Sequence, residues 1–185
     1  MSHPQDEPVA WPEISTERGP NILIARVRFD LLENPRTKQA MKRTVLEMPT
    51  WVNVVALTAD QDLILVKQYR FGTRAVSLEV PGGLVDPGEE PLAAARRELR
   101  EESGYTSDDW TLLGSVEPNP AIQDNRCFHY LARNAVRTHE LEMDPGEDLV
   151  VTTLPLAEVP AAVRDGRLCH SLVVSALARI VDLRG

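Results

Sequence analysis

The sequence GLVDPGEEPLAAARRELREESGY, which spans residues 83–105, predicts a turn followed by a single helix. Glycine and proline supply the free and the fixed backbone angles of a loop, and they occupy positions 82, 83, 87 and 88. Pro91 suits the first position of the helix and Gly104 its end. At about 100° per residue, one narrow stripe of this helix would pack on a core. The stripe consists of Leu92, Ala95, Leu99 and Ser103.

Three glutamates gather beside this stripe. Glu98 and Glu102 lie next to it, and Glu101 is adjacent to both. Like charges at such spacings repel by roughly a few tenths of a kcal/mol per pair, so a bound cation would account for their crowding. Carboxylate oxygens suit Mg²⁺ or Mn²⁺, with water and substrate phosphate completing the shell. The alternative is a solvated charged helix that contains pairs such as Arg97 with Glu101.

The same stretch resembles the signature of the Nudix hydrolases. That signature is a glycine, five residues, a glutamate, seven residues, Arg-Glu, an apolar residue, any residue, Glu-Glu, any residue, a glycine and an apolar residue. Only Tyr105 departs from it, because the family usually has an aliphatic residue there, and a packing position can accept an aromatic ring. The matching positions are Gly83, Glu89, Arg97, Glu98, Leu99, Glu101, Glu102 and Gly104.

The resemblance implies a metal site at this segment, which we call the Nudix box. Glu98 and Glu102 would be metal ligands, and Glu101 a third ligand or the residue that activates water. The carbonyl of Gly82, just before the box, would be a further ligand. Divalent ions, Mg²⁺ or alternatively Mn²⁺, would neutralise a diphosphate and lower the pKa of a bound water.

The resemblance also implies roles for residues around the metal. Arg97 would hold a glutamate in place by an ion pair, with a direct phosphate contact as the alternative. Glu89 would either reach toward the same network or favour the positive helix N-terminus. Arg70 would contact substrate phosphates, and Glu79 would lie near the metals or the terminal sugar. Trp51 would stack on the base, or else serve as a core or interface residue.

Enzymes of this family that cleave diphosphate sugars also use an acid on a loop far beyond the box. The candidates are Glu140, Glu142, Asp144 and Glu147. Glu147 is preferred because it comes just before a predicted strand at residues 149–153; the alternative is an exposed acidic loop. His129 falls in the middle of another predicted strand and is interpreted as a sheet residue rather than a catalyst.

Composition bounds the class of protein. The 185 residues fit one domain with a small appendage; 43% are hydrophobic and 26% are charged. A net charge of −8 argues against a nucleic-acid surface. The two cysteines, Cys127 and Cys169, predict free buried thiols in a reducing compartment. We find neither a signal peptide nor an apolar run long enough for a membrane span, so we expect a soluble, cytoplasmic protein.

The order of predicted elements indicates an α+β fold. Strands are expected at residues 52–58, 63–69, 75–80, 110–116, 126–132 and 149–154, and helices at 91–103, 156–164 and 171–183. The resemblance implies a Nudix-type α/β/α sandwich with a mixed sheet. Residues 1–20 are expected to be a flexible arm, residues 21–48 an N-terminal β-hairpin, and residues 49–185 the catalytic domain. Because two strands alone are marginally stable, the hairpin suggests a homodimer, which is also the habit of related diphosphate-sugar enzymes.

These features predict a Mg²⁺-dependent pyrophosphatase. Its substrate would be ADP-ribose or another nucleoside diphosphate sugar, and its products a nucleoside monophosphate and a sugar phosphate. One alternative is a pyrophosphatase that removes unwanted nucleoside triphosphates, although such small enzymes usually lack the N-terminal hairpin. The other is a non-catalytic nucleotide-binding regulator, which would usually have lost box glutamates.

Overall fold

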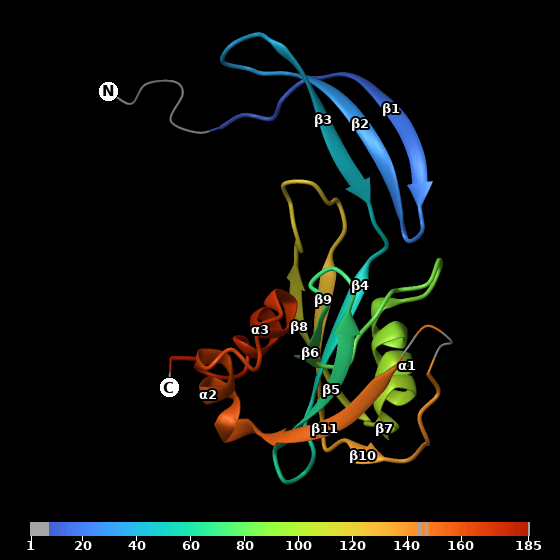
Figure 1. Ribbon diagram of the computed structural model, residues 1–185, viewed down its shortest axis with the longest axis vertical. Coiled ribbons are helices and arrows are strands. Elements are labelled where there is room, and N and C mark those ends of the chain that lie inside the picture. The colour runs from blue at the N-terminus through green and yellow to red at the C-terminus, as the bar shows by residue number, and fades with distance from the viewer. Residues whose placement is uncertain (1–7, 144–145, 147, 185) are drawn as a thin grey trace. The chain divides into compact units, whose positions relative to one another are not determined.

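The computed structural model describes residues 8–143, 146 and 148–184, and the chain divides into two compact units (Figure 1). The first unit contains the described residues up to Pro49 together with Asn119–Asn125. The second contains Thr50–Pro118 and the described residues from Arg126 onward. No helix in the described part of the chain is long and apolar enough to cross a membrane.

The first unit is a three-stranded antiparallel sheet, which consists of the expected hairpin and one additional strand before it. Its strands β1 (Glu13–Ile22), β2 (Ala25–Glu33) and β3 (Ala40–Glu47) pair in the order β1-β2-β3. In these three strands only Ala25 and Asp30 are buried. The sheet therefore has almost no core of its own.

Strand β1 corrects the expected flexible arm at residues 1–20, of which residues 1–7 lie outside the described part. The four prolines of that region suggested an extended segment without pairing. In the structure Pro12 precedes the strand, and its carbonyl accepts a hydrogen bond from the Glu33 amide at 2.9 Å. Pro20 lies in the register shift between Arg18 and Asn21, where a residue without an N–H is tolerated.

The segment Asn119–Asn125 attaches to the edge of β3. The Leu46 amide donates to the Ile122 carbonyl at 2.7 Å, and the Met48 amide donates to a carboxylate oxygen of Asp124 at 3.1 Å. Arg28 reinforces this attachment, because its Nη1 bonds both Glu47 and Asp124, at 3.1 and 3.2 Å. The loop between two strands of the second unit thus belongs to the N-terminal sheet.

Two three-stranded sheets build the second unit. One has the order β4-β9-β8 and is mixed, because β4 (Trp51–Ala56) and β9 (Cys127–Arg133) run parallel while β8 (Asp109–Val116) is antiparallel to β9. The other is antiparallel, with the order β11 (Leu149–Pro155), β5 (Asp62–Arg70) and β6 (Ala75–Glu79). The short strands β7 (Tyr105–Thr106) and β10 (Val136–Arg137) form a separate pair.

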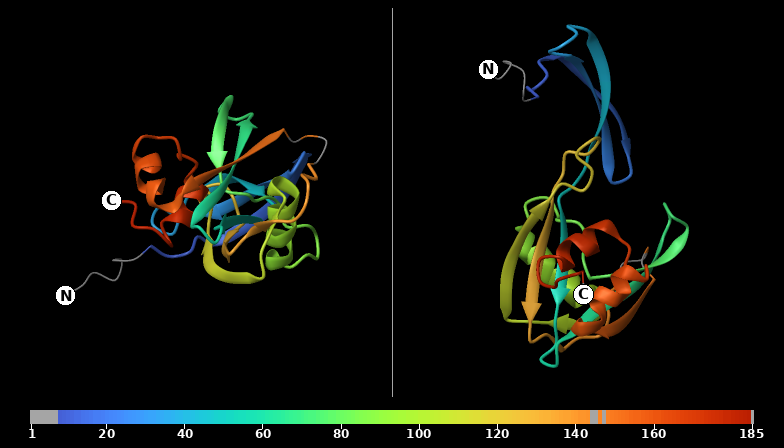
Figure 2. Two further views of the ribbon diagram at one scale, coloured as in Figure 1. Left: turned by 90° about the horizontal axis from the view of Figure 1, so that it is seen from below. Right: turned by 90° about the vertical axis from the view of Figure 1, so that its left-hand side faces the viewer.

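Helices cover the strands of this unit from two sides (Figures 1 and 2). Helix α1 (Pro91–Ser103) packs on one apolar cluster that includes Val54, Ile64 and Leu99. The 3₁₀ turn η1 (Leu156–Glu158), helix α2 (Val159–Arg164) and helix α3 (Ser171–Leu177) belong to the other side. Their cluster includes Leu65 and Leu177. This is the expected α/β/α arrangement.

Helix α3 is shorter than the predicted helix at residues 171–183. After Leu177 the backbone continues in turns, with the Ile180 amide bonded to the Leu177 carbonyl at 3.0 Å. Arg179 points its guanidinium at β8, where it donates to the carbonyls of Leu113 and Ser115 at 2.7 and 3.3 Å. Satisfying these two carbonyls is a tertiary interaction that helical periodicity cannot reveal.

The two cysteines differ in their environments. Cys127 is buried in β9, and this burial raises the pKa of its thiol to about 12. Cys169 is free but exposed, which corrects the expectation that both thiols are buried. It lies two residues before α3 begins at Ser171.

His129 in β9 is a fully buried sheet residue, as expected. Because of its burial, we predict that the stability of the fold is sensitive to acid. Burial, aided by the charge of Arg179, lowers its pKa to about 4. The pKa of a histidine in the unfolded chain is about 6.5. Between this value and the folded pKa, His129 therefore binds a proton in the unfolded chain but not in the folded one. The free energy of unfolding should fall by about 3 kcal/mol between pH 6.5 and 4 because of this residue.

Urea unfolding of the wild type and of His129→Gln across this pH range tests the prediction. The variant should show a shallower loss of stability, while the exposed control His139→Gln should follow the wild type. Parallel curves for the wild type and His129→Gln would contradict it.

Candidate active site

The box helix α1 begins and ends as its sequence predicts. Pro91 occupies the start of the helix, and Gly104 ends it with a left-handed φ of 74°, donating its amide to the Arg100 carbonyl at 2.8 Å. Apolar residues of one face hold α1 on the sheet. The glutamates on the neighbouring face are therefore fixed relative to the strands.

The turn before the helix runs along β4. The amides of Val52 and Val54 donate to the carbonyls of Gly83 and Pro81 at 2.9 and 2.8 Å. A side chain at Gly82 would overlap the Val52 carbonyl, and one at Gly83 would overlap the Glu98 carboxylate. Close approach to the β4 backbone thus requires glycine at 82, whereas a side chain at 83 would displace the Glu98 carboxylate. The backbone at residue 82 lies beside the glutamates.

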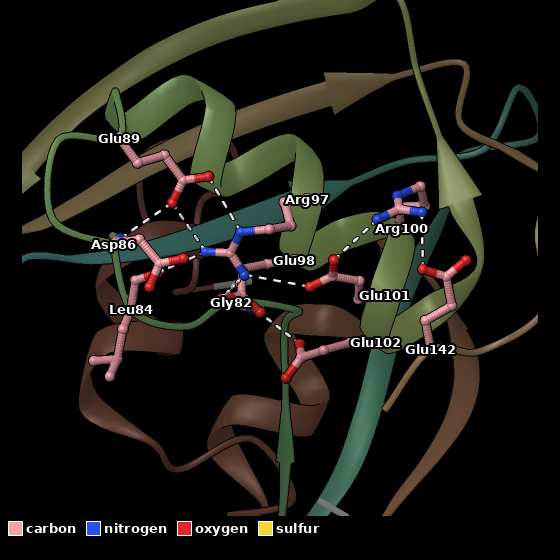
Figure 3. A network of polar contacts seen from close by, with 10 residues as sticks. All are labelled: Gly82, Leu84, Asp86, Glu89, Arg97, Glu98, Arg100, Glu101, Glu102 and Glu142. Atoms are coloured by element: carbon pink, nitrogen blue, oxygen red, sulfur yellow. Dashed lines mark hydrogen bonds and ion pairs between the residues drawn. The ribbon is translucent and has the colours of Figure 1, made fainter. Parts of the chain in front are cut away.

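Glu98 and Glu102 are the two buried acids of the box, with residue exposures of 7% and 3%. They lie one helical turn apart, and Figure 3 shows both directed toward the turn that precedes the helix. The Gly82 amide donates to Oε2 of Glu102 at 2.9 Å. Buried carboxylates are costly unless a cation or hydrogen bonds compensate them, so this pair fits the ligand role expected of it.

Arg97 is the centre of the polar network around the box (Figure 3). Its Nε and Nη2 grip Glu89 at 3.1 and 3.0 Å, and Nη2 also donates to the Leu84 carbonyl at 2.9 Å. Its Nη1 reaches Glu98 at 2.8 Å and Glu101 at 3.3 Å. The five N–H groups of a guanidinium can all be accounted for by these contacts. This favours the ion-pair role over a direct phosphate contact.

The same network assigns Glu89 to Arg97 rather than to the helix N-terminus alone. Hydrogen bonding by Arg97 holds the pKa of the Glu89 carboxyl below its usual range, and the Asp86 amide contributes through a 3.1 Å hydrogen bond. In return, Glu89 above all raises the pKa of Arg97 beyond its ordinary value, although burial opposes this. The guanidinium is therefore a permanent cation among the box acids.

Glu101 is held by two arginines. Its Oε1 accepts from Arg100 at 2.9 Å and its Oε2 from Arg97 at 3.3 Å. Arg100 also bonds Glu142 at 2.9 Å, and the Glu142 amide donates to the Glu101 carbonyl at 2.9 Å. To bind a metal ion, Glu101 would therefore have to break its hydrogen bond to one of these arginines. It is not a preformed metal ligand.

Among the residues described, no three histidine, cysteine, aspartate or glutamate side chains are arranged as a ready metal site. The donors that the structure brings together here are the carboxylates of Glu98 and Glu102, and carboxylate oxygens are hard ligands of the kind that Mg²⁺ prefers. The fit rests on Glu98 and Glu102 being buried at one place with an arginine as their neighbour. Few protein ligands are needed, because Mg²⁺ usually keeps several waters.

Of the expected loop acids, only Glu140 and Glu142 lie in the described part of the chain. Glu140 is exposed and bonds Arg137 at 3.5 Å, whereas Glu142 is linked through Arg100 to Glu101. Asp144 and the preferred Glu147 lie outside the described residues.

Arg70 and Glu79 form a second charged group, at the ends of β5 and β6. Nε and Nη2 of Arg70 donate to the two oxygens of Glu79 at 2.8 and 2.7 Å. Burial opposes ionisation of Glu79, but the hydrogen bonds and charge of Arg70 outweigh it, so the pKa of Glu79 is lowered. Three residues further on is Gly82, which connects this pair to the box.

Sequence reasoning missed a third member of this group. Nε2 of His170 lies 3.9 Å from Oε2 of Glu79. His170 is 91 residues away from Glu79 in the sequence, and no spacing rule relates the two. Trp51 is partly buried at the start of β4, where its amide bonds the Arg126 carbonyl at 2.8 Å and its backbone pairs with Leu84 of the turn before the helix.

Comparison with known proteins places these features in context. Residues 49–172 match the NUDIX domain. An ADP-ribose pyrophosphatase of Bacillus subtilis (strain 168) is 34% identical over 128 residues, which are 69% of each chain. The ADP compounds hydrolase NudE of Escherichia coli (strain K12) is 32% identical over 142 residues, 77% of this chain and 74% of that one.

Two further similarities extend over most of the chain. A methanol dehydrogenase activator of Bacillus methanolicus is 28% identical over 165 residues, 89% of each chain. The crystal structure of an ADP compounds hydrolase resembles this structure with a TM-score of 0.83 and 27% identity, covering 95% of both chains.

Proposed function

Because this chain belongs to the Nudix family and is an ADP-ribose pyrophosphatase-like hydrolase with the Nudix fold, we propose that it uses Mg²⁺ to cleave the diphosphate of ADP-ribose or another nucleoside diphosphate sugar. The products are a nucleoside monophosphate and a sugar phosphate. The observation that carries the proposal is the burial of Glu98 and Glu102, one turn apart on a box helix whose arginine is already paired.

The residues of the box divide the work. Glu98, Glu102 and the Gly82 carbonyl would hold the ion, with Glu101 joining them if it leaves one of its arginines. When bound, a divalent ion neutralises diphosphate charge and lowers the pKa of a coordinated water. Arg97 keeps the glutamates in place, since its guanidinium contacts Glu98 and Glu101 directly.

Substrate binding would come from the second charged group. Arg70 has a side chain that is 44% exposed, so its guanidinium can meet a phosphate while Glu79 orients it. Glu79 would lie toward the terminal sugar or the metals, and Trp51 is retained as a candidate for the base. The loop acid is proposed to be Glu147, and Glu142 is the described alternative because of its link to Glu101.

A homodimer is part of the proposal. The N-terminal sheet buries only two residues of its strands, and apolar side chains remain exposed on it. A sheet without a core needs a partner surface, and a second copy of this chain is the simplest one. Exposed apolar residues of β1 and of the turn between β1 and β2 are Ile14, Ile22, Leu23 and Ile24.

A substrate panel tests the reaction. With Mg²⁺ present, the protein should hydrolyse ADP-ribose, GDP-mannose or UDP-glucose faster than nucleoside triphosphates. The reason is that Arg70 would contact the diphosphate and Glu79 would lie toward the terminal sugar, which triphosphates lack. A chelator should abolish turnover and Mn²⁺ should restore part of it. Faster hydrolysis of triphosphates would support the sanitising alternative, and metal-dependent nucleotide binding without turnover would support a regulator.

A further inference from the structure

Glu79 is a buried carboxylate with few partners among the residues that the structure describes. Its residue exposure is 4%, so water reaches it poorly. Arg70 supplies both strong hydrogen bonds, and the Ser77 side chain adds a further one. The third neighbour is His170, whose Nε2 is 3.9 Å from Oε2 of Glu79. This distance is longer than a hydrogen bond, so His170 stands beside Glu79 without yet bonding it.

The Nε2 atom of the His170 imidazole is placed to donate a hydrogen bond to Glu79. His170 directly precedes α3 with an extended backbone, at φ −66° and ψ 122°, and its side chain is 31% exposed. Its Nδ1 is buried and has no hydrogen-bond partner among the residues that the structure describes. A neutral imidazole carries a single N–H. Placing that N–H on Nε2 directs it toward the Glu79 carboxylate.

Substrate would change the demands on Arg70. A diphosphate competes with Glu79 for the guanidinium, since both are anions that prefer its paired N–H groups. A buried carboxylate that loses its cation is strongly destabilised. A second donor one small side-chain movement away would offset part of that penalty.

We propose that His170 is a positioning residue that donates from Nε2 to Glu79 when Arg70 turns toward the substrate diphosphate. Glu79 then stays ionised and in place in both states. This role rests on the proposed function, because it takes a diphosphate as the competitor. The partner exchange itself involves only Arg70, Glu79 and His170.

Steady-state kinetics with ADP-ribose and Mg²⁺ test the consequence for binding. His170→Ala should raise KM about 10-fold, the usual cost of one charge-assisted hydrogen bond, and change kcat less than about 3-fold. His170→Gln, which returns an N–H near Nε2, should bring KM back to within about 3-fold of the wild type. The exposed His139→Gln is the matched control. An unchanged KM in His170→Ala would overturn the proposal, as would a fall in kcat and melting temperature that glutamine does not rescue.

Proton NMR of the metal-free protein without substrate tests the exchange directly. The Cε1–H resonance of His170 is identified by its absence in His170→Gln. Arg70→Ala should shift this resonance, because Glu79 then turns to His170, and adding Glu79→Gln should cancel the shift. Arg70→Lys serves if the alanine variant fails to fold. If the His170 resonance stays unshifted in both Arg70 variants, the proposed partner exchange is wrong. If the resonance shifts but the protein hydrolyses no substrate, only the proposed function is contradicted.

Discussion

Glu102→Gln is expected to lower kcat on the order of 10³-fold with Mg²⁺, while the protein stays folded. The substitution removes a negative charge from a proposed metal ligand, and metal ions contribute several kcal/mol to such reactions. The amide oxygen of glutamine can still accept the hydrogen bond from the Gly82 amide, which Glu102 now accepts at 2.9 Å. Turnover at saturating ADP-ribose across a range of Mg²⁺ concentrations measures the effect.

The matched control is Glu158→Gln in η1, which removes the same charge from an exposed position away from the box. Its kcat should equal that of the wild type, and circular dichroism should show that both variants are folded. Weak Mg²⁺ binding by Glu102→Gln in calorimetry would identify the lost charge as the cause. A Glu102→Gln enzyme with near-normal turnover would falsify the ligand role.

Removal of residues 1–48 is expected to convert a dimer into a monomer. The full-length chain should show twice the 20.6 kDa of one copy in light scattering, and the truncated chain only its own mass. The physical reason is the N-terminal sheet, which exposes apolar side chains and buries only Ala25 and Asp30 of its strands. KM for ADP-ribose should rise in the truncated protein if association supports the substrate site.

Circular dichroism and thermal unfolding of the truncated chain serve as the control for folding. The apolar clusters on the two sides of the second unit do not include residues of the deleted segment, so a cooperative transition should remain. A monomeric mass for the full-length chain would contradict the dimer without touching the proposed reaction.

The box helix shows how far local sequence reaches. Pro91, Gly104 and the apolar stripe act within a few residues of one another, and capping and periodicity are local properties of the backbone. The start, the end and the buried face of α1 therefore agree with the sequence. The family, and with it the fold, followed from charged residues at fixed spacings in this same stretch.

Strand β1 and helix α3 show where local reasoning stops. The prolines of residues 1–20 suggested no pairing, yet a strand forms because β2 offers a complementary edge and a bulge accommodates Pro20. Helix α3 ends early, and beyond it Arg179 meets the carbonyls of β8. In both cases the deciding partner is distant in sequence.

By itself, the sequence determined the turn, the box helix and the acids on one of its faces, because capping, periodicity and spacing are encoded within a single segment. Only the tertiary structure decided which partner each charge takes. It paired Arg97 with Glu89 eight residues away, Arg100 with Glu142, and Glu79 with Arg70, and it placed His170 3.9 Å from Glu79. Electrostatic interactions depend on distance and burial in space, and the chain reveals neither until it folds.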